Sequence, residues 1–201
     1  MSPQTIIFYG ASGAGKGTQA KLVKEYLEAN DPKRPVLYLE TGARLREFVK
    51  EANRTSEIVK KTLEEGGLLP SFVPIWAWTD FLIRHFSGEE HLIWDGLARR
   101  YHEAVILDDA LQFYKRDQLH VVVLNVSRDW SVTRLRERGR SDDVEEKDVD
   151  ERLAWYQSEV VPAINFFREN GRSIIHDING EQTIEEVHQD ILRALNFLPT
   201  T

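Results

Sequence analysis

The sequence contains no cysteine among its 201 residues. This absence excludes disulfide bonds, thiolate nucleophiles and zinc sites built on cysteine. The six histidines do not follow the spacing of a metal-binding motif, and they stand at positions 85, 91, 102, 120, 176 and 188. We therefore expect neither thiolate chemistry nor a histidine-based metal centre.

Long apolar runs and an excess of basic residues are also missing. No apolar stretch approaches the ~20 residues that a membrane-spanning helix needs. The N-terminal segment has a short apolar run with no basic residues before it, which predicts a strand rather than a signal peptide. We expect a cytoplasmic protein without a membrane partner. The net charge of −7 argues against nucleic acid as a partner, although local arginines can still bind phosphate.

The composition is that of a globular protein with a real core, because 41% of the residues are hydrophobic and 29% are charged. The length suits one domain with a small inserted subdomain. We find no internal repeat, low-complexity segment or flexible linker. A monomer is expected, and an oligomer is left open.

Segments with strand character alternate with helical segments along the chain. Strands are predicted at 5–9, 36–39, 91–94, 120–126 and 172–176, and those at 5–9 and 120–126 are expected to be buried. Helices are predicted at 16–29, 41–65 with a break near 53–56, 73–86, 107–115, 130–137, 148–169 with a kink at Pro162, and 183–197. This alternation predicts an α/β fold with a five-stranded parallel sheet flanked by helices. Ligands bind such sheets at the carboxyl ends of the strands.

A glycine-rich loop, Gly10–Thr18 (GASGAGKGT), lies between the first strand and the first helix. Glycines let phosphate approach the backbone, and consecutive N–H groups with the helix N-terminus form an anion-binding nest. Lys16 would reach the β- and γ-phosphates of a nucleotide, and the Thr18 hydroxyl could reach Mg²⁺. The strand before the loop and the helix after it favour a phosphate-binding P-loop over a plain glycine-rich turn.

The segment GASGAGKGTQA resembles the signature of adenylate kinases and their UMP/CMP kinase relatives, with Ser12 where that family usually has proline. Two further motifs follow in the family order: TGARLR at 41–46 resembles TGDxLR, and DGLAR at 95–99 is similar to DGxPR. The resemblance covers nearly the whole chain. It implies a P-loop kinase fold with an inserted NMP-binding helical subdomain at 41–86. It also implies direct in-line transfer of the γ-phosphate from ATP-Mg²⁺ to a nucleoside monophosphate.

The resemblance assigns the residues that bind the acceptor and the metal. Arg46 and Arg99 would grip the acceptor phosphate from two sides, as suits the guanidinium fork. Asp95 would hold Mg²⁺ through water, whereas the family aspartate that assists it is Ala43 here. The expected NMP-binding residues are Thr41, Arg46, Leu69, Gly96, Arg99, Glu103, Arg140 and Arg152. The expected ATP-binding residues are Gly13, Ala14, Gly15, Lys16, Gly17, Thr18, Arg134 and Gly180, and the expected metal-site residues are Thr18 and Asp95.

A cluster of arginines and aspartates resembles the family pattern RxxxRG…RxDD…R; it comprises Arg134, Arg138, Arg140, Asp142, Asp143 and Arg152. Arg134 would stack on the ATP adenine. The other arginines would surround the transferring phosphoryl group, whose charge is spread over three oxygens. The expected catalytic residues are Lys16, Arg99, Arg138, Arg140 and Arg152. One extra residue lies between Asp143 and Arg152 compared with the family.

The lid that covers ATP in this family is reduced to about residues 138–141. Because lids exclude water, we expect either measurable ATPase activity without acceptor or another element over the site. The aromatic segment 72–78 or a second subunit could cover the ATP site in place of the lid.

Glu103 stands where the family has a base-reading glutamine. A carboxylate has no donor for adenine N1 and suits bases that present N–H groups. Adenylate kinase (ATP + AMP = 2 ADP) is the leading prediction, with a GMP, dTMP or UMP/CMP kinase as the alternative. In a further alternative Glu103 faces solvent, so that Thr41 and the backbone read the base. From another class, the chain could be an ATPase or nucleotide sensor that transfers no phosphate to an acceptor.

Overall fold

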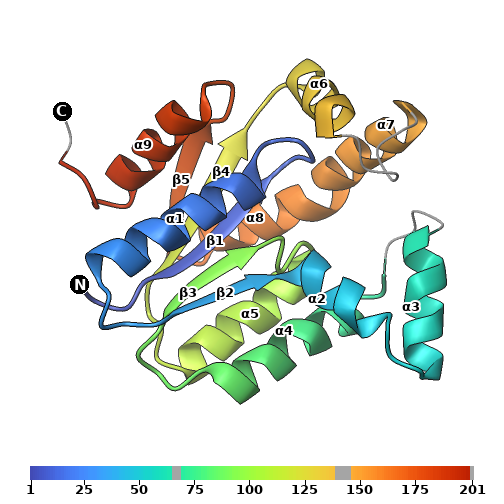
Figure 1. Ribbon diagram of the computed structural model, residues 1–201, viewed down its shortest axis with the longest axis horizontal. Coiled ribbons are helices and arrows are strands. Elements are labelled where there is room, and N and C mark those ends of the chain that lie inside the picture. The colour runs from blue at the N-terminus through green and yellow to red at the C-terminus, as the bar shows by residue number, and fades with distance from the viewer. Residues whose placement is uncertain (65–68, 139–145, 200–201) are drawn as a thin grey trace.

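The computed structural model describes residues 1–64, 69–138 and 146–199, and within these ranges the side chains of residues 138 and 146–149 are not described. Its centre is a five-stranded parallel sheet with the order β2-β3-β1-β4-β5 (Figure 1). The strands are β1 Thr5–Gly10, β2 Val36–Glu40, β3 His91–Asp95, β4 Leu119–Asn125 and β5 Ser173–Asn179. The predicted α/β fold is confirmed.

Helices cover both faces of this sheet (Figure 1). They are α1 Lys16–Asn30, α2 Thr41–Phe48, α3 Arg54–Glu64, α4 Phe72–His85, α5 Tyr101–Phe113, α6 Arg128–Arg138, α7 Glu146–Trp155, α8 Val161–Glu169 and α9 Ile184–Ala194. Successive residues of a strand point to opposite faces. Ile6 and Phe8 therefore pack with α1 and α9, whereas Ile7 and Tyr9 pack with α4, α5 and α8. This two-sided burial explains the apolar run Ile6–Tyr9 in β1.

Four of the predicted helices differ from the structure, and one of them, predicted at 183–197, ends earlier, at Ala194. The helix predicted at 107–115 begins earlier, at Tyr101. The segment predicted at 41–65 forms two helices, α2 and α3, with the break close to its expected position. The long helix predicted at 148–169 is divided by a π-helical turn, Tyr156–Val160, which comes directly before α8. Pro162 offers no N–H to the preceding turn, and the wider turn lies where that hydrogen bond is lost.

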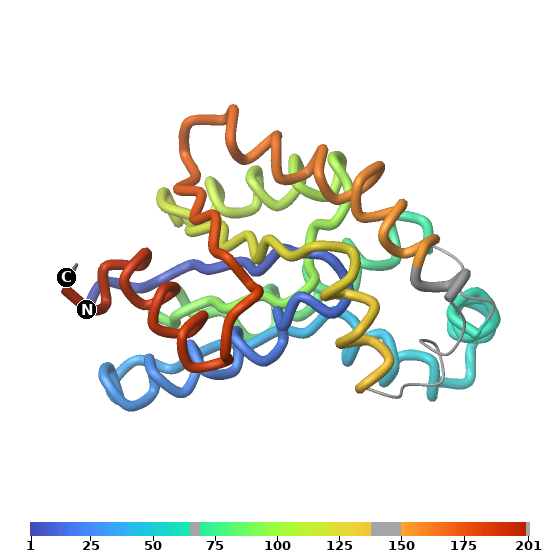
Figure 2. The backbone as a smooth tube through the Cα atoms, turned by 90° about the horizontal axis from the view of Figure 1, so that it is seen from above, coloured from blue at the N-terminus to red at the C-terminus, as the bar shows by residue number. Residues whose placement is uncertain are grey.

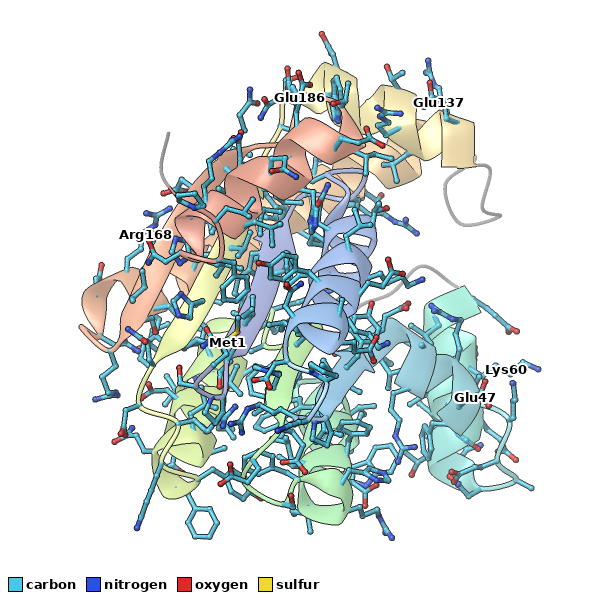
Figure 3. All side chains as sticks on the ribbon, turned by 60° about the vertical axis from the view of Figure 1, so that its left-hand side comes forward. Met1, Glu47, Lys60, Glu137, Arg168 and Glu186 are labelled. Atoms are coloured by element: carbon cyan, nitrogen blue, oxygen red, sulfur yellow. The ribbon has the colours of Figure 1, made fainter. Side chains whose placement is uncertain are left out.

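Helices α2, α3 and the first half of α4 share a small apolar core of their own. It contains Leu45, Phe48, Val59, Val73 and Ala77. The second half of α4 packs instead into the main core through Trp78 and Leu82. In Figure 3, the labelled side chains of Glu47 and Lys60 mark the outer surface of α2 and α3. This packing is compatible with the predicted subdomain at 41–86, which stays a prediction. Among the described residues, no helix is long and apolar enough to cross a membrane.

A pair of stacked histidines joins β4 to β5. His120 Nδ1 lies 2.9 Å from His176 Nε2, and the rings are nearly parallel with centroids 5.2 Å apart. Burial, assisted by the neighbouring His176, lowers the pKa of His120 to about 4, and burial also lowers the pKa of His176. The folded protein therefore favours both rings in the neutral form.

This pair predicts a loss of stability in mild acid. Because the unfolded chain takes up the proton near pH 6.5, the contribution of His120 is complete above that pH and is lost as the pH falls towards 4. We expect the free energy of unfolding of the wild type to decrease between about pH 7 and about pH 5. In His120→Gln, this decrease is expected to be smaller by about 1–2 kcal/mol. Denaturant titrations at both values measure this. The matched control is His102→Gln, an exposed histidine on α5; an unchanged pH dependence in His120→Gln would contradict the prediction.

Candidate active site

The glycine loop connects the C-terminal end of β1 to the N-terminus of α1, at the carboxyl edge of the sheet (Figures 1 and 2). Gly13 and Gly15 adopt left-handed backbone conformations, with φ of 85° and 89°. A Cβ atom on Gly13 would also lie only 2.8 Å from the Ser131 carbonyl oxygen. Gly15 is the N-cap of α1 and offers no side chain to cap it. The first N–H groups of the helix are thus left for an anion.

Lys16 is folded over this loop. Its Nζ donates hydrogen bonds to the carbonyl oxygens of Gly10 and Ala11, at 2.8 and 2.9 Å. The ammonium group is therefore held above the same turn that offers its N–H groups to a phosphate. Gly180 lies against the other side of the loop, because a Cβ atom on it would be 3.6 Å from the Ala14 carbonyl oxygen. Its N–H donates to the Asn125 carbonyl at 2.9 Å, which fixes the chain after β5 beside β4.

Asp95, the last residue of β3, reaches the first turn of α1. Its Oδ2 would lie 2.9 Å from a Cβ atom on Gly17, so the glycine between Lys16 and Thr18 makes room for this carboxylate. Burial raises the pKa of Asp95, and the charges of Lys16 and Arg99 oppose that rise. Asp95 is thereby placed between the loop lysine and an arginine of the expected acceptor site.

The oxygens of Asp95 and Thr18 fit the requirements of Mg²⁺. Mg²⁺ is usually held by one or two carboxylates together with waters and substrate phosphates. Thr18 is exposed on the turn that Asp95 touches, and within the described residues its hydroxyl makes no hydrogen bond. No group of three or more histidine or acidic side chains able to hold a metal occurs in the part of the chain described. A metal here would therefore depend on the nucleotide for further ligands.

The contact between Gly17 and Asp95 predicts an unusual pairing of effects. Gly17→Ala is expected to lower kcat by about 10–100-fold, because the new methyl group displaces the Asp95 carboxylate. The same change is expected to leave stability within about 1 kcal/mol of the wild type, because alanine is the better helix former. Turnover as a function of Mg²⁺ concentration, together with thermal unfolding, measures both. If the displaced carboxylate is the cause, Gly17→Ala has no further effect in an Asp95→Ala background; a full additional loss there would contradict it.

The two expected acceptor arginines are anchored from separate elements. Arg46 on α2 donates from Nη2 to Glu40 Oε1 at 2.7 Å. Arg99 donates from Nε to the Gly96 carbonyl at 3.0 Å, and a Cβ atom on Gly96 would lie 2.5 Å from Arg99 Nη2. Gly96 has a φ of 71°, so both its conformation and this close approach require glycine.

Hydrogen bonds from β1 and to α5 further fix the backbone around Arg99. Ala98 has a φ of 50°, and its carbonyl accepts a 2.7 Å hydrogen bond from the buried Tyr9 hydroxyl. The Arg99 N–H donates to Glu103 Oε2 at 2.9 Å. Tyr9 is not among the site residues predicted from the sequence, where its only signal is an aromatic residue directly before the glycine loop.

Glu103 is buried, with 4% of its surface exposed, so the alternative in which it faces solvent is wrong. Burial raises the pKa of its carboxyl group, and hydrogen bonds from Ser71 and from the N–H groups of Arg99 and Arg100 oppose that rise. The carboxylate thus satisfies N–H groups at the start of α5, which is a helix-capping role. Leu69 lies close by, because its carbonyl accepts a 2.9 Å hydrogen bond from Arg100 Nη1.

Thr41 begins α2 and is 5% exposed, and its hydroxyl makes no hydrogen bond to any described residue. A buried hydroxyl without a partner is costly and is suited to a ligand or an ordered water. Its place at the carboxyl end of β2 is compatible with its expected position near the acceptor base.

Arg134 on α6, which is expected to stack on the ATP adenine, already contacts other side chains of the protein. Its guanidinium lies 4.8 Å from the centroid of the Trp130 ring and pairs with Glu137 at 3.2 Å. Trp130 presents an aromatic surface that sequence analysis did not assign to the site. In Figure 3, Glu137 is labelled at the top of the view, and Glu47 and Lys60 are labelled lower on the same side.

Part of the expected arginine cluster lies outside the described residues. This applies to Arg140, Asp142, Asp143, the expected lid at 138–141 beyond the end of α6, and the side chain of Arg138. Arg152 is half-buried on α7, next to α6. Figure 1 places α6 and α7 on one side of the glycine loop and α2 and α3 on the other. The structure thus brings Lys16, Asp95 and Arg99 together and leaves Arg138 and Arg140 as predictions.

Comparison with known proteins identifies close counterparts. A family model described as adenylate kinase matches residues 8–172. The adenylate kinase of Leptospira biflexa serovar Patoc is 34% identical over 194 residues, covering 94% of this chain and 98% of its own length. Adenylate kinase 1 of Nostoc sp. is 31% identical over 190 residues, covering 94% of this chain and 97% of its own. The adenylate kinase of Flavobacterium psychrophilum is 28% identical over 200 residues, covering 96% of this chain and 98% of its own.

Proposed function

Because the chain belongs to the adenylate kinase family, we propose that it transfers the γ-phosphate of ATP to AMP and so forms two molecules of ADP. The protein is an ATP-dependent phosphotransferase, a nucleoside monophosphate kinase. AMP as the acceptor is the proposal, and the names of the relatives support it.

The main support from the site is the position of Asp95 between Lys16 and Arg99. Lys16 belongs to the loop that would hold the donor, and Arg99 to the segment that would hold the acceptor phosphate. The charges of Lys16 and Arg99 both oppose the rise in the Asp95 pKa, and Asp95 Oδ2 would lie 2.9 Å from a Cβ atom on Gly17 of the glycine loop. An acceptor phosphate oxygen is already anionic and needs no general base. Catalysis would then consist of positioning and charge neutralisation.

Each expected site residue has a role in this proposal. Gly13, Ala14, Gly15 and Gly17 would line the site of the donor phosphates, with Gly180 beside them. Lys16 would neutralise the β- and γ-phosphates. Thr18 and Asp95 would hold Mg²⁺, which supplies further positive charge to the phosphates when bound. Arg138, Arg140 and Arg152 would complete the charge around the transferring group.

On the acceptor side, Arg46 and Arg99 would hold the monophosphate, with Gly96 permitting the close approach of Arg99. Thr41 and Leu69 would contact the acceptor. Arg134 would leave Trp130 to stack on adenine, or adenine would add to that stack.

Glu103 supports the alternative of a GMP, dTMP or UMP/CMP acceptor, because a carboxylate accepts N–H groups. Its oxygens already serve N–H groups of the chain, however, which weakens that reading of the base. A competition among AMP, GMP, CMP, UMP and dTMP at equal concentration tests the choice. We expect ADP formation from AMP to dominate. Preferential phosphorylation of another monophosphate would contradict the proposal and favour the alternative.

A further inference from the structure

Glu40 forms an ion pair with Arg46, one of the two arginines that would bind the acceptor phosphate. Glu40 ends β2, and its Oε1 accepts a 2.7 Å hydrogen bond from Nη2 of Arg46 on the helix that follows. The Arg46 side chain is 56% exposed and the Glu40 side chain 27%. An acceptor phosphate can therefore reach the guanidinium, but it has to compete with a carboxylate of the chain itself.

Glu40 also stands beside Asp95. The two residues are paired in register across the neighbouring parallel strands β2 and β3, so their side chains leave the sheet on the same face. Both side chains are carboxylates, and like charges at neighbouring positions repel. Arg46 compensates Glu40 as long as their ion pair is intact.

We propose that Glu40 couples acceptor binding to Mg²⁺ binding: the acceptor phosphate displaces it from Arg46, and the freed carboxylate joins Asp95 in holding the water around Mg²⁺. This inference rests on the proposed function. Without Arg46, Glu40 is left next to Asp95 with no other ion pair to the residues that the structure describes. A divalent ion favours oxygen ligands and removes that repulsion. Ala43, on the following helix, has no side-chain oxygen to offer in its place.

The coupling has a sign that can be measured. Without Mg²⁺, the acceptor phosphate has to break the ion pair of Glu40 with Arg46, and this cost weakens acceptor binding. With Mg²⁺ present, the displaced Glu40 carboxylate interacts with the hydrated metal ion, which offsets the cost. Coupling free energies between sites are reciprocal, so Mg²⁺ tightens acceptor binding as much as the acceptor tightens Mg²⁺ binding. Glu40→Gln removes the charge of Glu40. It is therefore expected to tighten acceptor binding in the absence of Mg²⁺ and to abolish the effect of Mg²⁺ on acceptor binding.

Calorimetric titration of AMP into the 201-residue protein tests this, with the donor site filled by β,γ-methylene ATP and with either Mg²⁺ or EDTA present. In the wild type, we expect Mg²⁺ to tighten AMP binding about tenfold. In Glu40→Gln, we expect metal-free AMP binding about tenfold tighter than in the wild type, and an effect of Mg²⁺ below about twofold. Glu47→Gln is the matched control, because Glu47 is an exposed carboxylate on α2 paired with Lys50 at 2.7 Å.

Two results would overturn the inference alone: metal-free binding in Glu40→Gln that equals or falls below that of the wild type, or an Mg²⁺ effect that survives the substitution. The same holds if Glu47→Gln reproduces the effect of Glu40→Gln. If the competition assay identifies another acceptor, that monophosphate replaces AMP as the titrant. A wild-type protein that binds and phosphorylates no monophosphate would overturn the proposed function, and this inference with it.

Discussion

Arg99→Ala is expected to lower the rate of phosphoryl transfer by about 10³-fold or more, while ATP binding stays within about twofold of the wild type. The reason is its position: hydrogen bonds to the Gly96 carbonyl and to Glu103 hold Arg99 in the turn after β3, the segment that would bind the acceptor phosphate. The lost charge and hydrogen bonds are those on the acceptor phosphate. Initial-rate kinetics in both substrates, with calorimetric ATP binding, separates the two effects.

The matched control is Arg54→Ala on α3, an exposed arginine paired with Glu57 at 3.3 Å, which we expect to be neutral. Arg99→Lys keeps the charge but loses the planar fork, and we expect it to recover only part of the activity. Any ATPase activity without acceptor should survive Arg99→Ala. Transfer at more than about a tenth of the wild-type rate would show that Arg99 does not hold the acceptor.

Lys16→Met is expected to lower kcat/KM for ATP by about 10³-fold, and it should reduce transfer and acceptor-free ATPase together. Methionine keeps an unbranched apolar stem and removes the ammonium, which hydrogen bonds with the carbonyls of Gly10 and Ala11 hold above the glycine loop. The loss of both activities distinguishes a donor-side role from the acceptor-side role of Arg99.

Lys24→Met on the same helix provides the control, because Lys24 is partly exposed and pairs with Glu28 at 2.7 Å. We expect its kinetics to match the wild type. A Lys16→Met protein that folds, as judged by thermal unfolding, and retains more than about a third of wild-type kcat/KM would refute the role of Lys16.

The sheet and the glycine loop could be predicted from sequence because their signals are local. The strands contain short apolar runs such as Ile6–Tyr9 and Val121–Leu124, and Gly10–Thr18 has its loop chemistry in nine consecutive residues. The break between α2 and α3 was visible for the same reason. The start of α5 at Tyr101 was missed because the capping carboxylate, Glu103, contacts the backbone of Arg99 and Arg100 only in the folded turn.

Other features depend on contacts between distant segments, which no local pattern contains. The neighbourhood of Glu40 and Asp95 requires the strand order, since these residues are 55 positions apart and are joined only by the pairing of β2 with β3. The need for glycine at position 17 requires the Asp95 side chain to be in place. The support of Ala98 by Tyr9 likewise joins β1 to the turn after β3.

Following the γ-³²P label of ATP is the most direct test of the proposed phosphoryl transfer from ATP to AMP. Incubation of the wild-type protein with labelled ATP, Mg²⁺ and AMP should move the label into ADP, and Arg99→Ala should block this movement while any label released as inorganic phosphate persists. Release of the label only as inorganic phosphate, with AMP and every other monophosphate left unlabelled, would contradict the account and identify an ATPase on the same scaffold.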